Sequence, residues 1–273
     1  MENVYVINGA NIFSENAIIL ANKFNIKLVT DFKPKARDIY IVFGAHDIAL
    51  QLLEAQKNSD CVYIIMNSEQ IGSVVFENKF YIQLMKNNFV FDYNHLTSNY
   101  LEETFEVKVL SYFFFDFMKL EPKEKTIDIL FIGTENENRK EIRDKLQKEF
   151  PDKKIEFIMD WSLTEPIKVK EKLSEAKYVL NIPYYTQNSL ETHRVNNALS
   201  CGATVVSLNS KDAQADAYYN DYIYFTDDLI EFFKNEDEVS KKPYEELIKD
   251  LTGKIYHHNL FIIKQLIDKV KNF

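Results

Sequence analysis

The segment from Ala176 to Ser207 constrains the fold of this chain more than any other. Its 32 residues read AKYVLNIPYYTQNSLETHRVNNALSCGATVVS, which is an apolar run, a polar loop, a helical pattern ending at Gly202 and a second apolar run. A strand–loop–helix–strand unit of this size places its polar loop at the carboxyl edge of a parallel sheet, where open α/β proteins bind ligands. We therefore expect functional residues at that edge.

The rest of the chain repeats this alternation. Apolar, β-rich runs occur at Val4 to Ile7, Ile26 to Val29, Asp38 to Phe43, Val62 to Met66, Phe89 to Phe91, Val107 to Leu110, Ile127 to Ile132, Ile155 to Met159 and Tyr222 to Phe225. Helical patterns separate several of them, and strands that alternate with helices imply parallel pairing in a covered sheet.

The chain divides at a charged, proline-bearing stretch from Leu120 to Lys125, which is typical of a linker. A length of 273 residues suits two α/β units of about 120 residues each. We predict an α/β protein with two Rossmann-like, doubly wound domains, residues 1–120 and 121–250, and a C-terminal helix over residues 251–273 that packs on the domains.

The tail is helical in pattern except near Gly253. Leu260, Ile263, Leu266, Ile267 and Val270 form an apolar stripe at helical spacing. Such a stripe needs a partner surface, and either domain or a second subunit in a homodimer would satisfy it.

Composition limits the partners and the compartment. The net charge of −9 argues against a protein that grips nucleic acid over its whole surface, although a local basic groove would still allow it. No run approaches the ~20 apolar residues of a membrane span, and Met1 to Ile7 lacks the basic flank of a signal peptide, so we predict a cytoplasmic protein. Cys61 and Cys201 have no second sulfur or histidine at metal spacing and are expected to be small buried residues.

Within the opening segment, Asn188 or Ser189 can cap the helix and present free N–H groups to a phosphate. The carboxylate of Glu191 can accept the hydroxyls of a ribose or a sugar, and Arg194 can contact a diphosphate. Alternatively, the two residues form only a surface ion pair at i,i+3, worth about 0.2–0.5 kcal/mol. Spacing alone leaves both alternatives open.

The run from Ser189 to Ser207 resembles the donor-binding segment of GT-B glycosyltransferases, particularly small ones found in large DNA viruses and bacterial surface-glycan loci. Three strand exits, Ile41 to Asp47, Tyr63 to Gln70 and Phe91 to Asn94, resemble the same group, as does Ile129 to Thr134.

The sequence also departs from the family pattern. In many relatives a glutamate that holds the donor ribose stands where this chain has Asn197. Glu191 precedes Asn197 by six residues, whereas the widespread retaining-enzyme motif would have seven.

The resemblance implies roles for further residues. In the second domain, the backbone of Gly133 and Thr134 would approach the donor diphosphate, and Arg139 would add positive charge unless it is simply solvated. In the first domain, His46 would act as general base or hold the transferred sugar. Glu69 and Asp92 follow equivalent strands and are rival carboxylate bases or, alternatively, loop caps.

The function implied is that of a glycosyltransferase, metal-independent, retaining and without a cofactor, that moves a sugar from a nucleotide-diphosphate sugar to an acceptor hydroxyl on a glycan, a lipid-linked glycan or another molecule. No Asp-x-Asp stands in the strand context that a metal-dependent GT-A transferase needs. Alternatives are a nucleotide-sugar epimerase of the same fold, a phage or viral transferase that modifies DNA bases, and an inactive nucleotide- or glycan-binding module.

Overall fold

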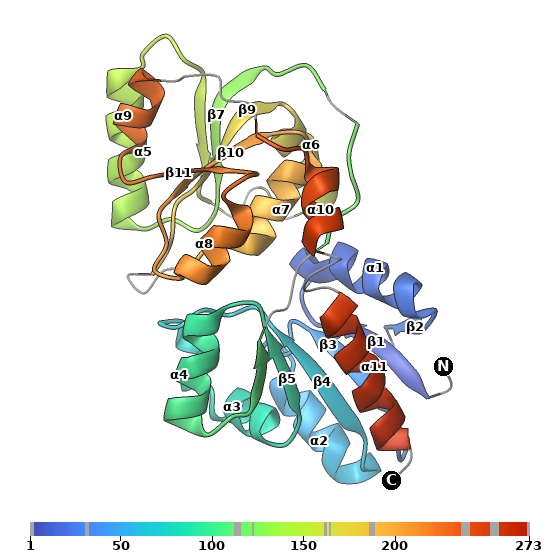
Figure 1. Ribbon diagram of the computed structural model, residues 1–273. Coiled ribbons are helices and arrows are strands. Elements are labelled where there is room, and N and C mark those ends of the chain that lie inside the picture. The colour runs from blue at the N-terminus through green and yellow to red at the C-terminus, as the bar shows by residue number, and fades with distance from the viewer. Residues whose placement is uncertain are drawn as a thin grey trace. The chain divides into compact units, whose positions relative to one another are not determined.

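The computed structural model describes residues 3–30, 33–111, 116–121, 123–160, 163, 165–185, 189–235, 241–251 and 257–271. The chain forms two compact units: unit 1 comprises Met1–Phe114 and Leu251–Phe273, and unit 2 comprises Phe115–Asp250. Each unit is built on its own parallel sheet with helices packed against it (Figure 1). The predicted fold class, an α/β protein with two Rossmann-like units, is confirmed.

Unit 1 has a six-stranded sheet in the order β2-β1-β3-β4-β5-β6 among its described residues. The strands are β1 (Val4–Asn8), β2 (Lys27–Val29), β3 (Ile39–Phe43), β4 (Val62–Asn67), β5 (Phe89–Asp92) and β6 (Val109–Ser111). The helices are η1 (Asn11–Phe13), α1 (Ser14–Phe24), α2 (Ala49–Ser59), η2 (Val74–Glu77), α3 (Lys79–Lys86), α4 (His95–Phe105) and α11 (His257–Lys271). All five residues of β3 are buried, as expected for the centre of a parallel sheet that is covered on both faces.

Unit 2 has a five-stranded sheet in the order β11-β10-β9-β7-β8 among its described residues. The strands are β7 (Ile127–Ile132), β8 (Ile155–Ile158), β9 (Ala176–Asn181), β10 (Thr204–Leu208) and β11 (Tyr224–Thr226). The helices are α5 (Glu137–Glu149), α6 (Pro166–Ser174), α7 (Thr192–Ser200), α8 (Ala213–Tyr219), α9 (Leu229–Lys234) and α10 (Tyr244–Leu251).

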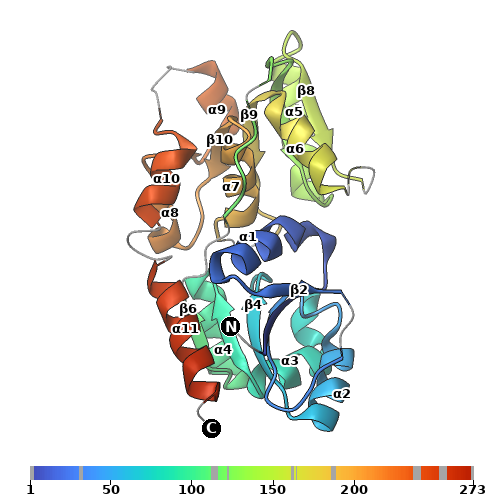
Figure 2. The same cartoon turned by 90° about the vertical axis from the view of Figure 1, so that its right-hand side faces the viewer.

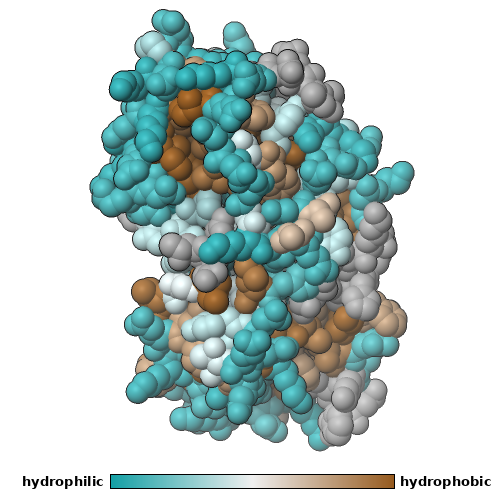
Figure 3. Space-filling view, turned by 60° about the vertical axis from the view of Figure 1, so that its left-hand side comes forward, coloured by the Kyte–Doolittle hydropathy of each residue, from teal (hydrophilic) through white to brown (hydrophobic). Residues whose placement is uncertain are grey.

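Helices lie on both faces of each sheet, as the two ribbon views show. In unit 2, α5 and α9 lie together on one face and α6 and α7 on the other (Figures 1 and 2). In unit 1, α2 and α3 share one face (Figure 1). The surface shown in Figure 3 is mostly hydrophilic, with hydrophobic side chains exposed in separate patches. The apolar residues therefore pack mainly between the helices and the sheets.

Two features of the helices differ from the sequence prediction. Helix α7 begins at Thr192 with Glu191 at the N-cap position, and no side chain caps it, so a cap at Ser189 is wrong; Asn188 lies outside the described residues. The tail is shared between the units, because α10 belongs to unit 2 and α11 to unit 1. Ile263 and Ile267 of the predicted stripe are buried, and the expected helix stop at Gly253 lies outside the described residues.

Two glycines set the shape of the sheet edge in unit 1. Gly44, at the end of β3, has a φ of +63°, a left-handed conformation that favours glycine. A Cβ on Gly9, after β1, would lie 2.5 Å from the carbonyl oxygen of Gly44. The loops that follow β1 and β3 are therefore packed backbone against backbone.

Candidate functional site

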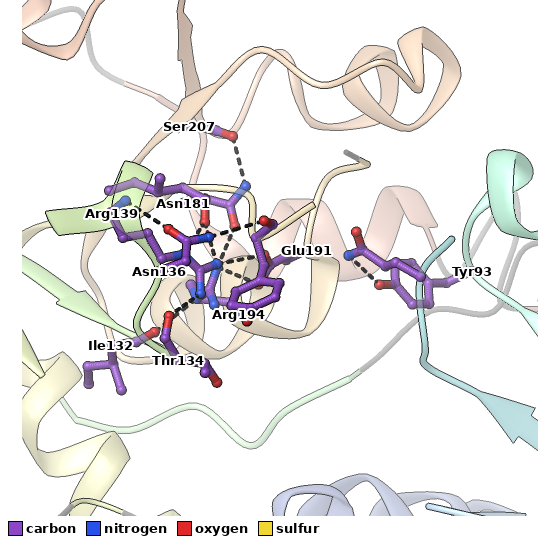
Figure 4. A network of polar contacts seen from close by, with 12 residues as sticks. Tyr93, Ile132, Thr134, Asn136, Arg139, Asn181, Glu191, Arg194 and Ser207 are labelled. Atoms are coloured by element: carbon purple, nitrogen blue, oxygen red, sulfur yellow. Dashed lines mark hydrogen bonds and ion pairs between the residues drawn. The ribbon is translucent and has the colours of Figure 1, made fainter. Parts of the chain in front are cut away.

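The carboxyl edge of the unit 2 sheet has a topological switch point between β7 and β9. From β7 the chain adds β8 on one side and then crosses to β9 on the other. The loops after β7 and β9 therefore leave in opposite directions, and ligands of open α/β sheets bind in the crevice that this creates. Arg139, Asn181, Glu191 and Arg194 meet at this point (Figure 4).

Arg194, on α7, joins the ends of the two strands. Its Nε donates to the carbonyl oxygen of Ile132 at 3.1 Å, and its Nη1 donates to Oδ1 of Asn181 at 3.1 Å. The guanidinium also pairs with Oε2 of Glu191 and lies 5.1 Å from the ring centroid of Phe131. Its side chain is 17% exposed, so this cation is anchored yet still reaches solvent.

Gly133 provides the room that Arg194 occupies. A Cβ at position 133 would lie 2.7 Å from Nη2 of Arg194 and 3.0 Å from Cζ of Phe131. The close approach expected at this glycine is thus made by a guanidinium of the protein itself. Thr134, the other residue of the predicted pair, supplies its carbonyl oxygen to Arg139.

Arg139 lies in the first turn of α5, which Asn136 caps by accepting from the backbone N–H of Arg139 at 2.8 Å. The residue is only 1% exposed, so the alternative of a solvated arginine is wrong. Its guanidinium donates to the carbonyl oxygens of Thr134 at 2.6 Å and of Ile182 at 2.5 and 3.1 Å, and to Oε1 of Glu191 at 3.1 Å.

Arg139 remains charged although its side chain is buried. Removal from water, followed by the nearby cation of Arg194, lowers the pKa of Arg139 to about 10, and Glu191 opposes the shift. That pKa is still well above neutrality, so the guanidinium remains protonated at physiological pH.

The carboxylate of Glu191 lies between the two guanidinium groups, with one oxygen on each. The predicted alternative of an i,i+3 pair between Glu191 and Arg194 is therefore realised, but as part of a three-residue cluster rather than as an isolated surface pair. Two cations and one anion leave a formal charge of +1 at the start of α7, where the helix dipole also favours anions. This arrangement is suited to a phosphate or diphosphate.

Among the described residues, the buried side-chain atoms of α7 without a hydrogen-bond partner include two oxygens, Oγ1 of Thr192 and Oδ1 of Asn197. Burying an unpaired polar atom costs about 1–3 kcal/mol, so such atoms are usually satisfied by something, including a ligand. Ser189, which the sequence places in the same site, is itself almost fully buried before the helix.

In unit 1 the switch point lies between β1 and β3 and is filled by the backbone of Gly9 and Gly44. Beside it, Nε2 of His46 lies 3.7 Å from Oε1 of Glu69, and both side chains are partly exposed. The other carboxylate oxygen of Glu69 accepts from Oγ of Ser73 at 2.8 Å. The structure therefore brings His46 and Glu69 together, with the carboxylate held from its far side.

Asp92, the third predicted catalytic residue, has a different environment. It is fully buried, with Oδ1 accepting from the backbone N–H of Asn94 at 2.8 Å and Oδ2 accepting from Asn67 at 2.5 Å. The Oδ1 of Asn67 in turn accepts from the Tyr81 hydroxyl at 2.7 Å. Burial, with Glu69 and Asp92 close by, raises the pKa of Tyr81 well above its usual value, so this donor stays protonated.

Sequence reasoning missed two groups of residues in these clusters. Asn181 and Asn67 are polar residues that end otherwise apolar strands, and that pattern was a signal that could have identified them. The aromatic support under the arginines, Phe131, carried no such signal because it reads as an ordinary core residue.

Among the residues that the structure describes, no three His, Cys, Asp or Glu side chains gather in a way that could hold a metal ion. In that part of the chain, no helix combines the length and the apolar character needed to cross a bilayer.

No protein-family model matches the chain. A curated relative, Regulatory protein RecX of Clostridioides difficile (strain 630), is 24% identical over 210 residues, which cover 76% of this chain and 92% of that protein. That identity is too low to assign the chain to the RecX family.

The chain is similar in structure to Anabaena Alr3699/HepE. The crystal structure of that protein in complex with UDP and glucose superimposes with a TM-score of 0.55 at 9% identity, over 97% of this chain and 99% of HepE. A second HepE structure, in complex with UDP, gives 0.47 at 9% identity, over 96% and 99% of the two chains. Together with the two parallel sheets, the first match shows that this chain has a glycosyltransferase-like GT-B fold.

Proposed function

We propose that this protein is a glycosyltransferase that transfers a sugar from a nucleotide-diphosphate sugar to an acceptor hydroxyl. The observation that carries the proposal is the Arg139–Glu191–Arg194 cluster at the switch point of unit 2, a partly exposed cationic site at a helix start. HepE, whose fold this chain shares, was crystallised with UDP and glucose, which supports the donor class.

In this proposal the donor lies at the carboxyl edge of the unit 2 sheet. Its diphosphate faces Arg194 at the start of α7, where the positive end of the helix dipole favours an anion. The carboxylate of Glu191, which is 19% exposed beside Arg194, is the group available to ribose or sugar hydroxyls. Arg139 does not contact the donor, because its donors are used by backbone carbonyls and by Glu191, and so it acts as the support of Glu191.

The acceptor binds, in this proposal, at the carboxyl edge of the unit 1 sheet. His46 takes the proton from the acceptor hydroxyl, whose oxygen bonds to the sugar carbon as the bond to the diphosphate breaks and the nucleoside diphosphate leaves. Glu69, whose Oε1 lies 3.7 Å from Nε2 of His46, orients the imidazole in this proposal. Asp92 is a loop support rather than the base, because both of its oxygens are committed inside the fold.

The stereochemistry is open to a direct test. A single displacement assisted by His46 inverts the configuration at the anomeric carbon, whereas the family resemblance implies retention. NMR of the first-formed product distinguishes the two outcomes, and retention would remove the base role from His46.

We further infer that arginine charge, rather than a bound metal, stabilises the leaving diphosphate. Initial rates measured in EDTA and in Mg²⁺ are then expected to agree. A rate lost in EDTA and restored by Mg²⁺ would contradict this inference.

The proposal is tested first by thermal shift with UDP, GDP and ADP and their glucose esters. A nucleotide that binds only the folded protein stabilises it by about 2.7 kcal/mol at 100 times its Kd. Incubation with the stabilising sugar nucleotide, with and without glucose, then follows the products. Nucleoside diphosphate release supports a transferase, conversion of the donor sugar alone would indicate an epimerase, and binding without turnover would indicate a binding module.

A further inference from the structure

We infer that Asn181 is the positioning residue that holds Arg194 in its donor-binding orientation, and that Ser207 fixes the direction of the Asn181 amide. The inference rests on the proposed function and deepens it, since it identifies which part of the sheet prepares the diphosphate site. Neither residue touches the donor in this account.

Asn181 and Ser207 are polar residues inside a sheet that is otherwise apolar at this level. They are register partners on β9 and β10, and both are almost fully buried. Apolar side chains here would pack without the cost of removing an amide and a hydroxyl from water. The buried pair of Asn181 and Ser207 therefore indicates a role other than packing in the core.

The hydrogen bonds give the Asn181 amide one direction. The hydroxyl of Ser207 donates its single proton to the carbonyl oxygen of Leu208 at 2.7 Å. Its oxygen is then an acceptor, which receives Nδ2 of Asn181 at 2.9 Å. Oδ1 is consequently the atom that faces Nη1 of Arg194, at 3.1 Å (Figure 4).

With this orientation, the Asn181 amide completes the set of acceptors that hold the Arg194 guanidinium. The guanidinium is planar, and Ile132, Asn181 and Glu191 take up its Nε and Nη1 edges. Among the described residues Nη2 has no hydrogen-bond acceptor, and it lies over Gly133 at the switch point. Fixing two nitrogens of the plane aims the third at the place proposed for the diphosphate, which reduces the ordering cost of binding.

The test compares three variants for UDP affinity and thermal stability. Asn181→Leu, which removes the acceptor with little change in size, is expected to raise the Kd for UDP about 10-fold, equivalent to the loss of one hydrogen bond to a charged group. Ser207→Ala is expected to raise it about threefold, because the amide keeps its place but not its fixed direction. Ser207→Thr, which keeps the hydroxyl, is expected to restore the affinity.

The matched control is Tyr219→Phe. It removes another buried hydrogen bond of unit 2, from the Tyr219 hydroxyl to Oδ1 of Asn196 at 3.0 Å, on the same helix as Arg194. It should lower the Tm about as much as Ser207→Ala and leave the Kd for UDP unchanged. In an Asn181→Leu background, Ser207→Ala should weaken UDP binding no further.

An unchanged Kd for UDP in Asn181→Leu would overturn the inference, and so would an equal loss of UDP affinity in Tyr219→Phe. Asn181 and Ser207 would then have only a structural role. If the unaltered protein binds none of UDP, GDP and ADP, the proposed function fails, and unfolding experiments then test whether Asn181 anchors Arg194. Asn181→Leu and Arg194→Met should lower the Tm non-additively if Asn181 holds Arg194, and additive changes would refute that contact's importance.

Discussion

The carboxyl edges of the two sheets carry opposite chemistry on the same architecture. At the switch point of unit 2, two guanidinium groups flank one carboxylate and rest on an aromatic ring. The corresponding point in unit 1 is closed by backbone at Gly9 and Gly44, and the groups beside it are an imidazole and carboxylates.

We infer from this difference that the loops, and not the sheets, would assign the proposed roles. A cationic edge at a helix start binds anions, while an imidazole next to a carboxylate handles protons. If this division is right, substitutions at the unit 1 edge alter the rate of transfer and leave nucleotide affinity unchanged. Substitutions at the unit 2 edge alter nucleotide affinity instead.

The largest effect is expected at His46. Replacement by Gln keeps a polar side chain of similar reach but removes the base, and should lower the rate of UDP release from UDP-glucose by about 10²- to 10⁴-fold. The Kd for UDP should not change. A variant that binds UDP less well, or turns over normally, would break the proposed division.

Arg139→Leu should reduce the stability of unit 2 by about 3–5 kcal/mol, because it removes one of the two arginine partners of Glu191 and leaves the buried carbonyl of Ile182 unpaired. Urea unfolding measures the loss. The control is Arg143→Leu, on the same helix, where the side chain is 31% exposed and pairs only with a neighbour; its effect should stay within about 0.5 kcal/mol. Equal losses would show that the buried cluster adds nothing to stability.

Glu69→Gln should slow turnover by about 10-fold, since the imidazolium at His46 loses an interaction with a charged partner. Glu77→Gln, an exposed carboxylate in the same stretch of unit 1, serves as the control and should leave the rate unchanged. A larger loss in the Glu69 variant than in His46→Gln would make Glu69 itself the base.

The smallest effect concerns Glu191 and distinguishes its two roles. Glu191→Gln removes a negative charge from between the arginines, so inorganic pyrophosphate, which has no ribose, should bind about fivefold more tightly. UDP-glucose should bind less well, because the carboxylate no longer accepts sugar hydroxyls. Calorimetry with both ligands measures this, and parallel changes in the two affinities would refute a separate hydroxyl contact.

Much of the architecture could be predicted from the sequence. Apolar runs separated by helical patterns gave the strands to within a few residues, including β7 at Ile127–Ile132 without error. The place of Glu191 and Arg194 at the carboxyl edge also followed from local order, because a strand–loop–helix–strand unit has only one arrangement in a parallel sheet.

The features that could not be predicted depend on contacts between residues far apart in the sequence. Arg139 looked solvated because the carbonyl that holds it, at Ile182, is 43 residues away. Asp92 resembled a base because nothing in the local sequence shows its hydrogen bond with Asn67. That bond forms only when β4 and β5 pair. The later start of α7 could not be deduced either, because Asn188 and Ser189 are favourable cap residues, whereas Glu191 holds the N-cap position without a side-chain cap.

The central claim is that Arg194 binds the donor diphosphate, and calorimetric titration with UDP tests it most directly. Arg194→Met should raise the Kd by about 10- to 100-fold, as expected for loss of a charge-assisted contact. His46→Gln and Arg143→Met, at a half-buried position on α5, should match the unaltered protein. An Arg194→Met variant that binds UDP as tightly as the unaltered protein would contradict the account.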